Sequence, residues 1–232
     1  MSNNLFSWVH VNRNVEKTYV VIPGWTILPH YFTAILPNFN LIILNPFVCS
    51  KSQTIEYINQ CQINGDIQIV ERSPASLKTI DGIYIFSMGL QWVKKHAEYW
   101  LNQPCIIQSP SSSYMESELK KIIMSFQKSS KATLIAFYKQ AVGSSGAWKW
   151  LRDHFLESHL QYVDEISAHS WLVNYAYEKV DLPDASGITI LLDKNDPIGI
   201  KPKPPINSKA NWVFHDYGHL LTPSDHKTVI NL

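Results

Sequence analysis

The sequence predicts an α/β fold, with a mostly parallel central sheet flanked by helices and a helical insert. Short apolar segments rich in Ile, Val and Leu alternate with segments of helical spacing, a pattern typical of parallel strands buried on both faces. Residues 114–181 have helical spacing over most of their length, which is too much helix for a single crossover. The length of 232 residues and the hydrophobic fraction of 45% suit one large domain.

Apolar runs that end at turn residues mark the expected strands. They are residues 5–11, 18–22, 41–44, 83–86, 105–107, 187–192 and 212–214. Residues 67–70 fit a short strand or a loop, because periodicity does not decide between them in so short a run. An amphipathic helix is expected from about Leu90 to Trp100.

The helical stretch divides the chain into a core, residues 1–113 and 182–232, and an insert, residues 114–181. Within the insert, helices are expected over the following ranges: 115–126, 130–142, 148–159 and 163–175. Open α/β sheets bind ligands at the carboxyl ends of their strands, so we expect the insert to be a lid over that edge. The alternative is a surface subdomain with no role in substrate access.

Ser87 ends the apolar strand 83–86 and precedes the helix that starts near Leu90. Gly89, two places later, permits a tight turn that presents the serine hydroxyl at the edge of the sheet, where the new helix directs its free N–H groups. This arrangement predicts a nucleophile. A helix N-cap is the alternative role for a serine in this position.

An acid and a histidine follow Ser87 in the order that a catalytic triad of this topology requires. Asp193 and Asp196 lie in the turn after strand 187–192, and Gly218-His219 follows strand 212–214. A neutral serine is a weak nucleophile, so a histidine has to take its proton and a carboxylate has to orient that histidine. His219 is the expected base; His215 ends the strand, and we expect His226 to lie on the surface or at a helix start.

Acyl transfer also needs two N–H donors for the developing oxyanion. The backbone N–H of Met88, directly after the nucleophile, is expected to supply one. The turn Pro23-Gly24-Trp25, after strand 18–22, is the best candidate for the other, through Trp25.

These motifs together resemble the α/β-hydrolase superfamily and, within it, the pimeloyl-ACP methyl ester esterases of biotin synthesis. The resemblance spans most of the chain but is carried by few residues. They are P-G-W at 23–25 (the family has H-G-W), F-S-M-G at 86–89 (G-W-S-L/M-G), L-K-K-I-I-M-S-F at 119–126, T-L-I-A-F-Y at 133–138, D-K-N-D-P at 193–197 and G-H at 218–219. The chain departs from the family at Ile85, which replaces the first glycine of the turn around Ser87 (residues 85–89, the elbow). It also departs from the family at Leu90 and at Pro23.

The resemblance implies a serine carboxylesterase that hydrolyses an acyl methyl ester, with pimeloyl-ACP methyl ester as the expected substrate. It places the triad acid at Asp196. Asp193 is the second candidate for the acid, and its other possible role is to cap the turn. A thioesterase or small-ester carboxylesterase of the same fold is a second reading. A catalytically inactive binding protein is a third, because Ile85 makes the elbow unusual.

An esterase of this kind binds an acidic acyl carrier protein, and the predicted lid is rich in lysine. Lys121 and Lys128 are candidate substrate-binding residues, as are Phe126, Phe137 and Tyr138, which could line an acyl channel. The alternatives are a solvated helix surface for the lysines and an internal lid core for the aromatic residues.

Composition excludes several other classes of protein. The net charge is +1, so we expect no nucleic-acid partner. No apolar run approaches the roughly 20 residues that span a bilayer. Three widely spaced cysteines fit free thiols in a reducing compartment, so a cytoplasmic protein is expected. The histidines lack metal-ligand spacing, and we expect neither a metal nor a cofactor.

Overall fold

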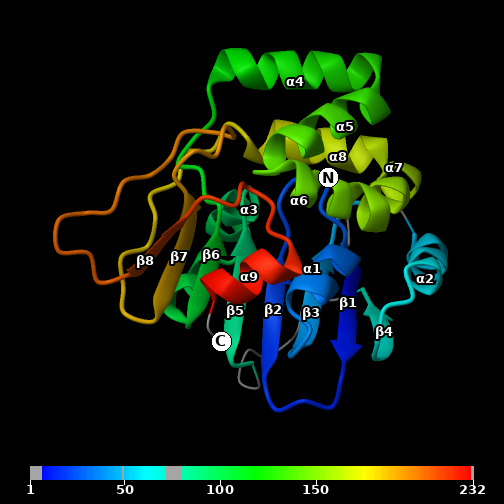
Figure 1. Cartoon of the computed structure of the whole chain (residues 1–232), viewed down its shortest axis with the longest axis horizontal. Helices are drawn as coiled ribbons and strands as arrows, with labels where there is room; N and C mark the ends of the chain where they lie inside the picture. The colour runs from blue at the N-terminus through cyan, green and yellow to red at the C-terminus, as the bar shows by residue number, and fades with distance from the viewer. Residues whose placement is uncertain (1–6, 49, 72–79, 231–232) are drawn as a thin grey trace.

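The computed structural model describes residues 7–48, 50–71 and 80–230 of the chain (Figure 1). Within them, eight strands form one sheet in the order β4-β1-β3-β2-β5-β6-β7-β8. β1 pairs antiparallel with β3 and β4, and the pairings from β3 through to β8 are parallel. The strands are β1 (Ser7–Asn12), β2 (Thr18–Ile22), β3 (Asn40–Asn45), β4 (Asp66–Val70), β5 (Gly82–Phe86), β6 (Cys105–Gln108), β7 (Ile188–Asp193) and β8 (Asn211–His215).

The mostly parallel sheet predicted from the sequence is therefore confirmed. The segment 67–70, which fitted either a strand or a loop, forms the edge strand β4. The first predicted strand begins at residue 5, but residues 5 and 6 lie outside the described part of the chain. The central strand β5 is buried along its whole length, as expected for a strand covered on both faces.

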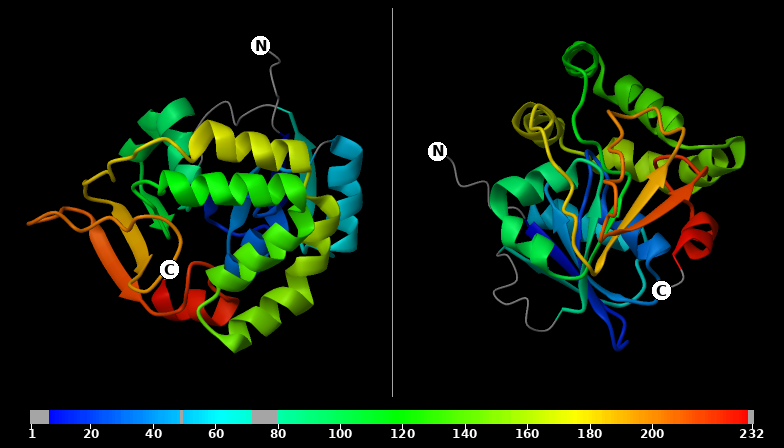
Figure 2. Two further views of the ribbon diagram at one scale, coloured as in Figure 1. Left: turned by 90° about the horizontal axis from the view of Figure 1, so that it is seen from above. Right: turned by 90° about the vertical axis from the view of Figure 1, so that its left-hand side faces the viewer.

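Helices cover both faces of the sheet and the edge at which the parallel strands end. α3 lies on one face, and α1 and α9 lie on the other (Figure 2). α4 to α8 connect β6 to β7 and form a layer over the carboxyl ends of the parallel strands (Figure 1). The helices are α1 (Pro29–Ile35), α2 (Lys51–Gln60), α3 (Gly89–His96), α4 (Glu116–Lys128), α5 (Ser130–Ala141), α6 (Ser145–Leu151), α7 (Glu157–Tyr162), α8 (Glu165–Tyr175) and α9 (Pro223–Val229).

Two predicted helices are interrupted. The helix expected to reach Trp100 ends at His96, because Ala97 leaves the helical conformation, and a 3₁₀ turn over Glu98–Asn102 follows. That turn buries Trp100, which packs against Trp8 with ring centroids 6.3 Å apart. The helix expected over 148–159 is divided into α6 and α7 by one π-helical turn.

Candidate active site

Ser87 occupies a strained turn between β5 and α3. Its φ is +50°, an uncommon conformation for a residue other than glycine, and its N–H donates to the carbonyl oxygen of Gln108 at 2.9 Å. A Cβ atom on Gly89 would lie 2.7 Å from the carbonyl oxygens of Ile22 and Pro23. The helix thus approaches the neighbouring strand so closely that only glycine fits.

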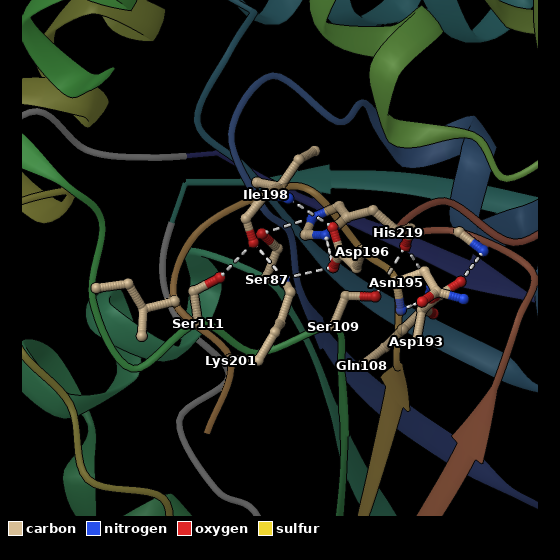
Figure 3. Close-up of polar contacts among 12 residues, drawn as sticks. Ser87, Gln108, Ser109, Ser111, Asp193, Asn195, Asp196, Ile198, Lys201 and His219 are labelled. Atoms are coloured by element: carbon tan, nitrogen blue, oxygen red, sulfur yellow. Dashed lines mark hydrogen bonds and ion pairs between the residues drawn. The ribbon is translucent and has the colours of Figure 1, made fainter. Parts of the chain in front are cut away.

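Ser87, His219 and Asp196 form a continuous hydrogen-bonded chain (Figure 3). The hydroxyl of Ser87 donates to Nε2 of His219 at 2.8 Å, and Nδ1 of His219 donates to Oδ2 of Asp196 at 2.7 Å. All three residues are buried, with 4%, 1% and 7% of their surface exposed, respectively. The structure therefore brings together the three residues that the sequence singled out as candidate nucleophile, base and acid.

Asp193, the alternative acid, makes different contacts. Its carboxylate accepts hydrogen bonds from the backbone N–H groups of Asn195 and Gly218. Its Oδ2 lies 3.9 Å from Nδ1 of His215, and burial lowers the pKa of His215 even though Asp193 opposes the shift. Asp193 thus holds the turn before His219, whereas Asp196 contacts the imidazole of His219 itself.

Both oxygens of the Asp196 carboxylate accept hydrogen bonds. Its Oδ1 accepts from the N–H of Ile198 at 2.8 Å, and its Oδ2 accepts from Nζ of Lys201 at 2.7 Å as well as from His219. Burial alone would raise the pKa of Asp196, but the charges and hydrogen bonds of His219 and Lys201 outweigh burial and lower the pKa to about 2. Asp196 is therefore ionised at neutral pH.

The loop that carries His219 is anchored on two sides. The carbonyl oxygen of His219 accepts hydrogen bonds from Nε2 of Gln108 at 3.1 Å and from Oγ of Ser109 at 2.9 Å, both at the end of β6. On the other side, the N–H of Leu220 donates to the carbonyl oxygen of Ala141 at the end of α5. The imidazole is thus positioned by the sheet and by the helical layer together.

The turn at Trp25 lies beside Ser87 and is held by the helices above it. The indole N–H of Trp25 donates to the carbonyl oxygen of Ala168 in α8 at 2.9 Å, and the hydroxyl of Tyr138 in α5 donates to the carbonyl oxygen of Thr26 at 3.0 Å. In the described part of the chain, the backbone N–H groups of Trp25 and Met88 have no hydrogen-bond partner. Both are therefore available to a ligand.

A cavity of about 300 Å³ opens beside the hydroxyl of Ser87. Its walls are mainly apolar, with a few polar and charged groups. The lining residues are Trp25, Ser87, Met88, Tyr114, Glu118, Leu119, Lys121, Ile122, Phe137, Gln140, Leu172, Pro197, Ile198 and Gly199. Contributions come from the sheet edge, from α4, α5 and α8, and from the loop after Asp196, so the helical layer supplies much of the wall.

Three of the five residues predicted to bind substrate line the cavity or its adjoining groove, and the other two do not. Phe137 and Lys121 line the cavity, and Lys128 lines an adjoining groove of about 410 Å³. Phe126 and Tyr138 are not among the lining residues. Phe126 packs against the indole of Trp25, with ring centroids 5.5 Å apart, and Tyr138 bonds to the Trp25 turn, so both support that turn from behind.

Tyr114, which the sequence did not single out, also faces this cavity. Its hydroxyl is buried and has no well-formed hydrogen bond to any described residue, although it lies close enough to Ser87 and Ser111 for both to affect its pKa. Burial raises the pKa of Tyr114 to about 12, and the two serines only oppose that shift. The hydroxyl is therefore neutral and free to donate to a ligand beside Ser87.

The prediction for His226 is confirmed in one of its two alternatives: His226 lies near the start of α9, where its N–H donates to the carbonyl oxygen of the N-cap residue Thr222. His226 lies within α9 and is 5% exposed, not on the surface, and burial lowers its pKa to about 4. It packs against the ring of Tyr84 in the core. An amphipathic helix start is hard to distinguish from a surface turn in so short a segment.

The described residues contain no group of three histidine, cysteine or acidic side chains arranged to hold a metal ion. Cys61 and Cys105 are free thiols, and Cys49 lies outside the described part of the chain. None of the described helices combines the length and apolar character needed to cross a bilayer.

Searches of protein families and of curated proteins found no match to the chain. Solved structures do match over nearly the whole length. Bromoperoxidase from Bacillus anthracis superposes with a TM-score of 0.65 at 11% identity, covering 97% of this chain and 92% of its own. The chain has the α/β-hydrolase fold. A hydrolase from Oleispira antarctica superposes with a TM-score of 0.61 at 14% identity, covering 94% of this chain and 90% of its own. BioG from Haemophilus influenzae superposes with a TM-score of 0.59 at 11% identity, covering 92% of this chain and 94% of its own.

Proposed function

We propose that this α/β-hydrolase-fold protein is a serine carboxylesterase with Ser87, His219 and Asp196 as its catalytic triad. The observation that supports this proposal most directly is the hydrogen-bonded chain from the hydroxyl of Ser87 through the imidazole of His219 to the carboxylate of Asp196. The conformation of Ser87, with φ at +50°, adds support, since backbone strain of this kind concentrates at functional residues.

In the proposed reaction, Nε2 of His219 takes the proton of Ser87 as Oγ attacks the ester carbonyl carbon. The backbone N–H groups of Trp25 and Met88 stabilise the oxyanion, and the hydroxyl of Tyr114 donates a further hydrogen bond to the bound ester. The C–O bond breaks and the alcohol leaves with the proton from His219. Water then attacks the acyl-enzyme by the same steps and releases the acid.

The proposed substrate is an acyl methyl ester on an acyl carrier protein, pimeloyl-ACP methyl ester in biotin synthesis. The sequence resemblance described above and the apolar cavity beside Ser87 support this choice. The adjoining groove shares Lys121, Ile122, Phe137 and Gln140 with the cavity and continues to Lys128. A chain that runs from the hydroxyl of Ser87 along this groove would leave past two lysines, which suits a tether to an acidic protein. Residues 114–181 would act as the lid.

The test is the mass of methyl pimeloyl-ACP before and after incubation with the wild-type protein and with Ser87→Ala. We expect the wild type to remove the mass of one methylene from the carrier-bound acyl group, and Ser87→Ala to leave the mass unchanged. Release of the whole acyl group would identify a thioesterase instead. An unchanged mass with the wild type, together with no hydrolysis of simple esters, would contradict the esterase proposal.

The double variant Lys121→Ala/Lys128→Ala tests the carrier. We expect kcat/KM to fall by about tenfold for the carrier-bound ester and to change little for a free methyl ester, since charges at the rim of an interface mainly affect association. Lys120→Ala is the matched control, because Lys120 is on the same helix, pairs with Glu116 and lines neither space. Equal losses on both esters would contradict a carrier-binding role.

A further inference from the structure

Lys201 lies against the carboxylate of Asp196, although the proposed triad mechanism does not require a cation there. Its side chain is 19% exposed, and its ammonium group contacts Oδ2 of Asp196 at 2.7 Å. The imidazole of His219 contacts that same oxygen at 2.7 Å. Lys201 and His219 therefore share one acceptor atom (Figure 3).

The loop from Asp196 to Lys201 folds back on itself, so that the ammonium group of Lys201 reaches the carboxylate of Asp196. The carbonyl oxygen of Ile198 accepts hydrogen bonds from the hydroxyl of Ser111, at 3.1 Å, and from the ammonium of Lys201. Gly199 adopts φ +70°, and a Cβ atom there would lie 2.3 Å from Oγ of Ser111. Two backbone hydrogen bonds join Ile200 to residues 112 and 113.

We propose that Lys201 is a positioning residue that fixes the carboxylate of Asp196 and offsets its charge, so that His219 remains an unprotonated base to lower pH. With Lys201 present, His219 faces an ion pair. Without it, His219 would face an uncompensated carboxylate, which favours the protonated imidazolium. A protonated His219 cannot accept the proton of Ser87, so activity on the acid side depends on the lysine.

The other ionisable groups around the site do not replace this contact. In the described part of the chain, Lys201 and His219 are the two side chains that bond to the carboxylate of Asp196. The remaining groups near the site are Asp193, His215, Tyr114, Glu118 and Lys121. Burial lowers the pKa of Lys201, whereas Asp196 and then Asp193 oppose that shift, so the ion pair with Asp196 favours the charged form of the lysine.

The test compares the wild type with Lys201→Met, which keeps the length and loses the charge, and with Lys201→Arg, which keeps the charge. Two quantities are followed against pH: the rate at which a fluorophosphonate labels Ser87, and the ¹⁵N resonances of the His219 imidazole in histidine-labelled protein. Comparison with a His219→Gln variant assigns those resonances. Thermal unfolding of each variant shows whether it is folded.

For Lys201→Met we expect the acid limb of the labelling profile, and the titration of the His219 resonances, to move together to higher pH by about one unit. Lys201→Arg should follow the wild-type profile. Superimposable profiles for a folded Lys201→Met variant would overturn the inference and leave the lysine a structural role only.

The inference rests on the proposed function, but the two fail in different ways. If Ser87 of the wild type is not labelled at any pH, the serine-hydrolase proposal fails. The resonances of His219 still report on Lys201 in that case, because they require no turnover. An unmoved His219 titration in Lys201→Met, with a labelled Ser87, would reject the lysine alone.

Discussion

Ser87 and Asp196 are held at the site by different kinds of force. Ser87 follows a fully buried strand, and close backbone packing around Gly89 fixes its turn. Asp196 lies in a loop that is held by hydrogen bonds and by an ion pair with Lys201. The first region is defined by shape and the second by polar contacts, many of them to the segment 111–113.

This difference predicts different responses to mutation. A change at the elbow meets backbone atoms that cannot move aside, so folding and activity should fall together. A change in the loop from Asp196 to Lys201 (the acid loop) removes a charge or a hydrogen bond while the sheet beneath stays intact. Activity should therefore fall with a smaller effect on stability.

The largest effect on activity is expected from Asp196→Asn. An amide in this position favours the wrong tautomer of His219, and removing the carboxylate of a triad typically costs about 10⁴-fold in kcat. It also leaves the ammonium of Lys201 without its partner. Steady-state hydrolysis of a p-nitrophenyl ester measures the loss.

Asp193→Asn is the matched control for the acid. Asp193 accepts from backbone N–H groups and does not contact the imidazole of His219, so we expect a loss of about tenfold, through displacement of the His219 loop. A loss for Asp193→Asn as large as that for Asp196→Asn would contradict the assignment of Asp196, and a larger one would identify Asp193 as the acid.

Gly89→Ala tests the elbow. The added Cβ would meet two carbonyl oxygens at 2.7 Å, so we expect a loss of about 2 kcal/mol in the free energy of unfolding and of about 100-fold in activity. Ser111→Ala is the comparison in the acid loop, where it removes the hydroxyl that donates to the carbonyl oxygen of Ile198.

For Ser111→Ala we expect about 1 kcal/mol of destabilisation from the lost hydrogen bond and about tenfold lower activity. Urea unfolding measures the free energy of unfolding of both variants, and ester hydrolysis measures their activity. Equal destabilisation by the two alanines would remove the distinction between a region fixed by shape and one fixed by polar contacts.

The same difference explains what the sequence could and could not predict. The strands, the mostly parallel sheet and the turn at Ser87 were predictable, because buried strands and close packing leave a local pattern of apolar residues and glycine. The apolar run 83–86 followed by Ser87 and Gly89 carries that pattern in seven residues. The order of serine, acid and histidine along the chain added the other two positions.

Lys201 and Tyr114 were not predicted, because their roles depend on long-range placement. Lys201 looks like any lysine in a polar loop until the hydrogen bonds between Ile200 and residues 112–113 bring the loop back. Tyr114 is distant from Ser87 in sequence and reaches it only through the path of the chain after β6. The burial of His226 was not predicted, because the seven residues of α9 are too few to show which face is buried.

The smallest effect on stability is expected from Tyr114→Phe, which separates function from stability in the segment that supports the acid loop. The hydroxyl is buried with no well-formed partner among the described residues, so its removal should leave the free energy of unfolding unchanged or raise it by up to about 1 kcal/mol. If the hydroxyl donates to the bound ester, kcat/KM should fall by about tenfold, the cost of one hydrogen bond. Stability and kcat/KM measured on the same preparation settle the point: a variant that loses both has a structural hydroxyl, and a variant that loses neither has a hydroxyl that the substrate does not use.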